Sequence, residues 1–299
     1  MWLIYTFLHT FFLALVNYSD EYLTHSNSTC NNASIHERIG GVLLISTFLC
    51  VIGISCIYLF VNDVSLNEYS LMLSIGSAIP MIISWGGYFY CLQIFSVHQV
   101  MPLFSLSSVV LLLIELIFGA YISVISLLGI MSLIFGSYLI NRGSFDFKSS
   151  VKLLVYMSPA IVSWAASMFM VKLATAEGSA MAVYFWQLVG MLFLAFVMFV
   201  TIKPYRKGLI GRIKNDEANF IIHSLFNESL SQLSFLFATL AISLAPLATY
   251  VSSLSGTQGV FLFLILKIFP LHDRNEISKA QWVGIICISM GIFMLEFLG

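Results

Sequence analysis

The polar residues with the most evident chemistry in this chain lie inside a long apolar stretch. Glu228 is near the middle of residues 217–243, and helical spacing places it one turn from Gln232 on the same side. Its neighbour Asn227 stands one turn from Ser231 in the same way. A carboxyl at the centre of a helix in hydrocarbon costs roughly 2.5–3.5 kcal/mol on insertion scales. We expect this band to face a cavity, with Glu228 as a protonatable or substrate-binding group; a structural carboxyl held between helices is the alternative.

Two further acids are candidates on other apolar stretches. Glu115 shares a stripe with Ser108 at helical spacing, but it is near the end of its stretch, where a solvated carboxylate is an equal interpretation. Asp20 follows Asn17 by one turn near the end of the first stretch. Asp20 can guard the mouth of a cavity or simply close a helix.

Aromatic and imidazole side chains add to the candidate site. Trp85 and Tyr88 are one turn apart, with Gly86 and Gly87 thinning the helix between them. An aromatic wall facing a carboxylate can hold an ammonium ion through cation–π contact and charge. His223 precedes Glu228 by five residues and is either a proton relay or a hydrogen-bonding helix contact.

The composition decides in which solvent these residues must be judged. Only 9% of the residues are charged, against about 25% in an ordinary globular domain. Hydrophobic residues make up 60% of the chain, and the mean hydropathy is +0.97. A net charge of −1 gives no field for nucleic acid. The chain is therefore expected to be a multi-spanning membrane protein whose partners are a small-molecule substrate and membrane lipids.

The apolar stretches predict an all-α membrane protein of ten transmembrane helices. A helix needs about 20 apolar residues to cross a bilayer, and the connections are too short to hold a soluble domain. The predicted spans are 2–24, 38–61, 69–95, 98–119, 121–141, 150–173, 180–202, 217–243, 246–269 and 279–298.

The two halves of the sequence resemble each other. Leu128-Gly129-Ile130 with Gly136 matches Val283-Gly284-Ile285 with Gly291, at an offset of 155 residues. Ile117-Phe118 matches Ile268-Phe269 at an offset of 151. Because five helices per half is an odd number, the second copy must be inverted across the membrane. We expect two five-helix repeats, 1–146 and 147–299.

Ten spans in about 300 residues, arranged as five plus five, resemble the drug/metabolite transporter superfamily and its EamA-type members. The run Asn275-Glu276-Ile277-Ser278-Lys279 before the last glycine-bearing span is similar to the acidic loop of those repeats. In the first repeat the matching loop, 119–123, lacks the glutamate and departs from that pattern. The resemblance implies alternating-access transport of a small metabolite and leaves the cargo open.

The expected function is secondary transport of a small neutral or cationic metabolite, amino-acid- or amine-like and proton-coupled, across the cytoplasmic (inner) membrane. Lys and Arg mostly flank the spans, so a phosphate-bearing cargo would lack its partners at the midplane. A flippase for a lipid-linked substrate and a non-transporting scaffold are the alternatives. No phosphate loop, zinc motif or nucleophile elbow occurs, so neither an enzyme nor a cofactor or metal is expected. A homodimer stays open.

The charge bias of the loops predicts an orientation. Loops after odd-numbered spans carry twelve Lys and Arg with their adjoining helix ends, and the other side has Lys172 alone. By the positive-inside rule, the basic face is cytoplasmic and both termini lie outside. The segment 203–214 in particular is expected to lie along anionic lipid headgroups.

Overall fold

The computed structural model of the 299-residue chain describes every residue except 26–33, 62, 96, 142–146, 215–217, 269–278 and 296–299. Over this described part all regular structure is helical. The helices are α1 (Trp2–His25), α2 (Ile35–Phe48), α3 (Cys50–Phe60), α4 (Glu68–Leu92), α5 (Val97–Phe104), α6 (Ser107–Ile117), α7 (Val124–Asn141), α8 (Phe147–Glu177), α9 (Ala180–Thr201), α10 (Lys203–Lys214), α11 (Ala218–Leu244), α12 (Ala248–Ser255), α13 (Gln258–Ile268) and α14 (Lys279–Phe293).

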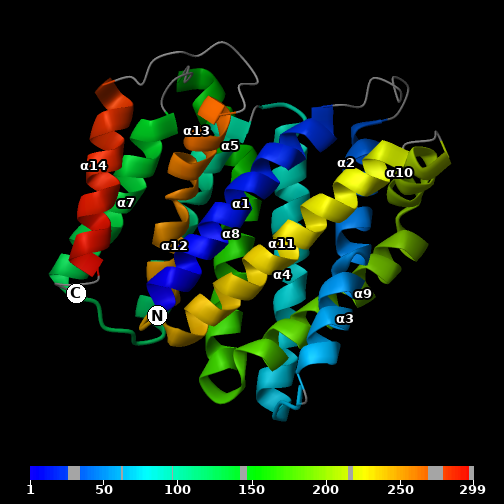
Figure 1. Ribbon diagram of the computed structural model, residues 1–299, viewed down its shortest axis with the longest axis horizontal. Helices are drawn as coiled ribbons and strands as arrows, with labels where there is room; N and C mark the ends of the chain where they lie inside the picture. Colours follow the sequence, from blue (N-terminus) through cyan, green and yellow to red (C-terminus); the bar gives the residue numbers. More distant parts are fainter. Residues whose placement is uncertain are drawn as a thin grey trace.

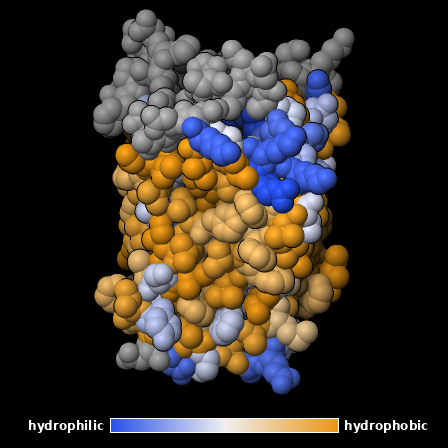
Figure 2. Space-filling view, turned by 90° about the vertical axis from the view of Figure 1, so that its right-hand side faces the viewer, coloured by the Kyte–Doolittle hydropathy of each residue, from blue (hydrophilic) through white to orange (hydrophobic). Residues whose placement is uncertain are grey.

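In the part of the chain that the structure describes, six apolar segments are long enough to cross a bilayer, which indicates a multi-pass membrane protein. On the face shown in Figure 2, an apolar band lies between hydrophilic patches near the two ends. In hydrocarbon every backbone polar group must be satisfied within the protein, and a helix does this within its own segment. The six segments are Trp2–Asp20, Ile35–Phe60, Glu68–Leu92, Val151–Glu177, Ala180–Thr201 and Ile221–Leu244.

Three of the predicted continuous spans are each divided into two helices. The stretch 98–119 is α5 and α6, and 246–269 is α12 and α13. Between α5 and α6 the Ser107 hydroxyl donates to the Phe104 carbonyl at 2.6 Å, and at the second break Gly256 N–H bonds the Ser253 carbonyl in a tighter turn. Such local bonds compete with the helical ladder. The stretch 38–61 is likewise α2 and α3, separated at Leu49.

The helices pack in pairs that join residues far apart in the sequence. Helix α1 lies along α11, α4 lies along α8, and α7 lies along α14 (Figure 1). Between α1 and α11, His9 Nδ1 bonds the Ser234 hydroxyl at 2.8 Å, and that hydroxyl donates to the His9 carbonyl at 2.9 Å. The start of α1 and the end of α14 lie at the same end of the molecule, and α10 lies at the opposite end (Figure 1).

Glycines set a close contact between α7 and α14. A Cβ added at Gly136 would lie 2.7 Å from the Gly284 carbonyl oxygen, and one at Gly291 would lie 2.7 Å from the Gly129 carbonyl oxygen. Real Cβ atoms do not approach backbone that closely, so side chains larger than hydrogen would push α7 and α14 apart. The glycines that suggested a repeat in the sequence therefore form one shared contact in the fold.

The basic segment 203–214, predicted at the membrane interface, is the helix α10. It packs against α2, where a Cβ on Gly208 would collide with the Glu37 backbone. Arg212 is buried there and donates to the Arg38 carbonyl at 3.3 Å. Part of the basic charge is therefore used to fix α10 to the helix bundle.

Candidate functional site

A cavity lies between the two halves of the chain. Its volume is about 70 Å³ for the centres of water-sized molecules, which is several times what one buried water needs. It is neither fully enclosed nor a shallow surface depression. The lining residues come from α1, α2, α4, α5, α6, α8, α11, α12 and α13 and from the two helix breaks. The lining side chains that the argument uses are Asn17, Asp20, Ser46, Trp85, Tyr88, Phe104, Ser105, Trp164, Asn227, Glu228, Phe235, Ser252, Gly256 and Gln258.

One polar network on the cavity wall joins α1, α4, α11 and α13. Asn227 Nδ2 donates to Asp20 Oδ1 at 2.8 Å, and Tyr88 OH donates to Asn17 Oδ1 at 3.1 Å. Asn17 Nδ2 in turn donates to Gln258 Oε1 at 3.2 Å. Tyr88 also lies in hydrogen-bonding contact with Asp20. These bonds fix the Asp20 carboxyl in a protein interior, where only 4% of its surface is exposed.

Glu228 lies on the same wall and is 2% exposed. Gln232 Nε2 donates to Glu228 Oε1 at 2.6 Å, which is the one-turn pairing expected from the sequence. The Ser46 side chain on α2 is a second hydrogen-bonding neighbour, and Asp20 is near enough to act on Glu228 through its charge. Gln232 is itself oriented from α9, because Tyr184 OH donates to its backbone and side-chain oxygens at 2.7 Å each.

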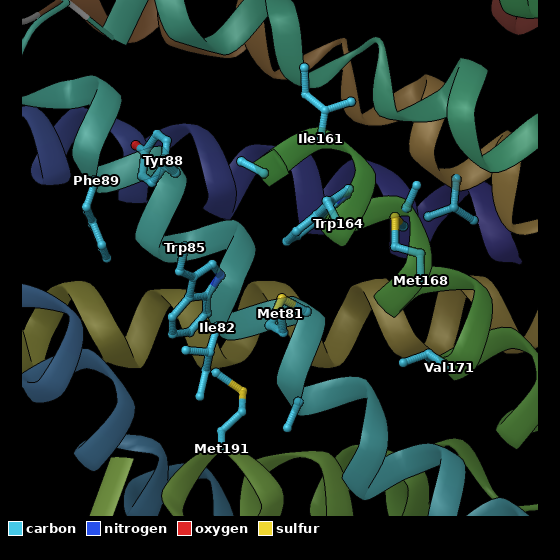
Figure 3. Packing of buried hydrophobic residues seen from close by; sticks show 14 of the residues in the cluster. Met81, Ile82, Trp85, Tyr88, Phe89, Ile161, Trp164, Met168, Val171 and Met191 are labelled. Carbon is cyan, nitrogen blue, oxygen red and sulfur yellow. The ribbon is translucent and has the colours of Figure 1, made fainter. Parts of the chain in front are cut away.

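Aromatic rings form much of the remaining lining of the cavity. The Phe235 ring centroid is 5.6 Å from both Trp85 and Trp164, and Phe104 is 6.0 Å from Trp164. Figure 3 shows Trp85 and Tyr88 along α4, with Trp164 on the neighbouring helix α8. Trp164 and Phe235 also line a second, smaller cavity together with Ser167, Gln187 and Thr239. The aromatic layer therefore separates two internal spaces.

The structure brings together most of the side chains that the sequence singled out. Asn17, Asp20, Trp85, Tyr88, Asn227 and Glu228 all line the cavity. Gln232 is buried behind Glu228, and the Ser108 hydroxyl donates to Ser252, a lining residue, at 3.1 Å. His223 has an exposed side chain and does not line the cavity, because it lies on another face of α11.

Glu115 does not line the cavity either, and its carboxyl binds the first turn of α12. Ala248 N–H donates to Glu115 Oε1 at 2.7 Å, and the N–H and hydroxyl of Thr249 donate to Oε2 at 3.3 and 2.5 Å. Lys172 completes this corner, because its ammonium donates to the carbonyls of Ile242 and Ala245 at the end of α11. An anion at a helix N-terminus and a cation at a C-terminus both oppose the charge of the helix ends.

Several cavity residues could not be picked from the sequence. Trp164 and Phe235 look like the many other aromatic residues of apolar spans, and their role follows only from the contact between α8 and α11. Ser46 is a single hydroxyl in an apolar stretch. Among these residues, Gln258 could have been recognised as a candidate from the sequence, since it is an amide in the middle of a predicted span.

Comparisons with known proteins show the fold alone. No protein-family model matches the chain, and no curated protein matches it. A solved structure described only as "Crystal structure of protein" is similar, with a TM-score of 0.64 at 11% sequence identity. The match covers 98% of this chain and 97% of that chain, so the whole helical arrangement exists in another protein.

Proposed function

We propose that the protein is a secondary transporter that moves a small neutral or cationic metabolite across the cytoplasmic membrane by alternating access, coupled to protons. The observation that carries the proposal is a cavity that holds two acids between two helix breaks. Ser105, at the break between α5 and α6, and Gly256, at the break between α12 and α13, both line it. Broken helices at a central site are typical of secondary transporters built from inverted repeats.

The matched bounds of the broken helices support such a repeat. Helix α5 (Val97–Phe104) is followed 151 residues later by α12 (Ala248–Ser255), residue for residue. Helix α6 (Ser107–Ile117) has α13 (Gln258–Ile268) at the same offset. This is the offset at which Ile117-Phe118 matches Ile268-Phe269 in the sequence. In the proposal these two pairs, with α7 and α14, add four crossings to the six long apolar segments, giving ten.

The contact between α7 and α14 supports the inversion of the second repeat. In the sequence, Gly129 corresponds to Gly284 and Gly136 to Gly291. In space Gly129 contacts Gly291, and Gly136 contacts Gly284. If a two-fold axis exchanges the halves, the first contact becomes the second, as in any isologous interface. The pairing of α1 with α11 and of α4 with α8 fits the same exchange.

The position of the barriers supports one end state of an alternating-access cycle. On α1, α4 and α11 the lining residues lie toward the end of the molecule where α10 sits. Closer to the termini lies the aromatic layer of Trp85, Trp164 and Phe235. The turn between α11 and α12, bound by Glu115 and Lys172, follows it. In the proposal this state is closed toward the termini, and rocking of the repeats opens the corner.

Glu228 is the proposed coupling group, with Asp20 beside it. Glu228 faces the carboxyl of Asp20 on α1, the Ser46 hydroxyl on α2 and the Gln232 amide on α11. The Cys50 thiol on α3 and the Tyr184 hydroxyl on α9 lie nearby, and both contact Gln232. None of them is a permanent cation. A proton or a cationic substrate can therefore neutralise the carboxyl, and exchange between the two couples their movements.

The family and the alternatives follow from the same features. The proposed EamA-type relationship rests on the repeat and on the run 275–279, of which 275–278 lie outside the described residues. In a non-transporting scaffold, the acids near the midplane would be paired within the protein and no cavity would be expected. A cavity lined by two acids therefore favours the transporter. A flippase would bind its lipid-linked substrate only in the presence of lipid, which distinguishes it in a binding assay.

The test is a search for cargo followed by transport. Purified protein is screened against small metabolites by thermal shift, and each stabilising compound is then tested for counterflow in proteoliposomes. The proposal expects accumulation of labelled compound in liposomes preloaded with the same unlabelled compound. Stabilisation without exchange, for every compound that binds, would contradict it.

A further inference from the structure

We infer that the cavity is built for an ammonium ion that carries N–H donors on a mainly apolar body, rather than for a neutral, quaternary or anionic molecule. The inference rests on the proposed transport function for its biological meaning, but it is tested by equilibrium binding alone. It narrows the substrate class from neutral or cationic metabolites to primary and secondary amines.

The first argument is the charge of the lining. Two carboxyl groups, Asp20 and Glu228, reach the cavity from different helices. Among the described residues that line it there is no Lys, Arg or His. The ammonium group of Lys172 is held elsewhere, by backbone carbonyls at the end of α11. An anionic group on the ligand would meet uncompensated negative charge, which burial makes costly.

The second argument is that the cavity wall has more hydrogen-bond acceptors than the protein's own donors fill. Asn227 is 3% exposed and lines the cavity, and its Oδ1 has no hydrogen-bond partner among the described residues, although its Nδ2 donates to Asp20. A buried acceptor without a donor is costly. The Glu228 carboxyl can accept about four bonds, and its hydrogen-bonding neighbours are Gln232 and Ser46. A ligand that supplies several donors at one atom, as a primary ammonium does, satisfies this set.

The third argument concerns the rest of the ligand. Six aromatic side chains line the cavity, namely Trp85, Tyr88, Phe89, Phe104, Trp164 and Phe235. Their faces attract a cation and their area favours an apolar body. The amine could come from a soluble molecule or from a lipid headgroup. The headgroup would bring a phosphate, for which the lining offers no cation, so the soluble source is favoured.

The experiment is isothermal titration of the purified protein with probes that share one body. Phenethylamine, phenethyl alcohol, 3-phenylpropanoate and the N-trimethylated amine differ only in the end group. The inference expects phenethylamine to bind about tenfold or more tightly than the alcohol, because charge-assisted bonds replace neutral ones. It expects the quaternary amine to bind more weakly than the primary one, and no measurable binding of the carboxylate.

Variants assign the preference to the two acids. Glu228→Gln and Asp20→Asn keep the shape of each side chain, and each should reduce the amine-to-alcohol preference severalfold while alcohol binding persists. Persistent alcohol binding also reports an intact cavity. Glu68→Gln, which changes an exposed carboxylate at the start of α4, is the matched control and should keep the preference.

Several results would overturn the inference. These are equal binding of the amine and the alcohol, binding of the carboxylate, or a full preference in the Glu228→Gln/Asp20→Asn double variant. Tighter binding of the short-chain lipid dihexanoyl-glycerophosphoethanolamine than of phenethylamine would assign the site to a lipid headgroup instead. Failure of uptake in proteoliposomes, with the amine preference intact, would contradict transport and leave this inference standing.

Discussion

Replacement of Glu115 by Gln should destabilise the turn between α11 and α12. The carboxylate accepts from Ala248 N–H, Thr249 N–H and the Thr249 hydroxyl, and it is 4% exposed. Glutamine keeps the size of the side chain but offers one acceptor oxygen in place of two. Its amide group would then point donors at the donors of the first turn of α12.

The size of the effect follows from the bonds lost. A hydrogen bond to a charged group contributes about 1.5–3 kcal/mol, and a neutral one contributes about 1 kcal/mol. A charge at a partly buried helix end adds up to about 2 kcal/mol. We therefore expect a loss of roughly 2–4 kcal/mol, of which a part is shared with Lys172. That corresponds to a decrease in the melting temperature of roughly 3–6 °C for a chain of this size.

The assay is thermal unfolding of purified protein in detergent. Glu177→Gln is the matched control, because that carboxylate is exposed and receives a bond from Asn67. Its melting temperature should change by less than about 2 °C, as for most surface substitutions. Lys172→Met, introduced into the native protein and into Glu115→Gln, should give losses of stability that are not additive, since both side chains bind the turn between α11 and α12. A Glu115→Gln protein that melts with the control would refute the capping role.

Three other predictions concern packing and orientation. Gly291→Leu should lower the melting temperature strongly, because its Cβ would collide with the Gly129 carbonyl. Gly211→Ala, with no atom within 4 Å of its Cβ, should not lower it. Equal melting temperatures of the two variants would contradict the packing of α7 on α14. Tyr184→Phe removes two bonds to Gln232 and should cost about 1–3 kcal/mol, against no change for the exposed Tyr58→Phe; a Tyr184→Phe protein as stable as Tyr58→Phe would exclude this role. In a cysteine-free background, a cysteine after Gly299 should react with an impermeant reagent outside intact cells and Lys207→Cys should not, and the reverse labelling would show that the orientation is wrong.

The helical membrane architecture could be predicted from composition alone. Low charge and long apolar runs require helices, since hydrocarbon offers the backbone no partner. The polar band around Glu228 was likewise visible, because a carboxyl inside an apolar run has few explanations. The position of Asp20 next to Asn227 depends on how α1 crosses α11, and no local pattern encodes that crossing.

The breaks within the spans and the fate of Glu115 could not be predicted. Both breaks fall in runs rich in small polar residues, 105–108 and 252–259, which also suit a continuous helix packed closely against a neighbour. Glu115 looked like a cavity acid or a solvated helix end, and only the approach of α12 makes it a cap. His223 was placed near the site by its distance along the chain, but five residues on a helix lead to a different face.

The most direct test of the central claim is uptake of an identified cargo into proteoliposomes by the native protein and by Glu228→Gln, with and without a pH gradient. Glutamine keeps the shape of the side chain and its bond with Gln232 in reach, while it removes the exchangeable proton. We predict that the native protein concentrates the cargo in response to the gradient and that Glu228→Gln, although folded and inserted, does not. Full, still gradient-driven uptake by Glu228→Gln would contradict the account.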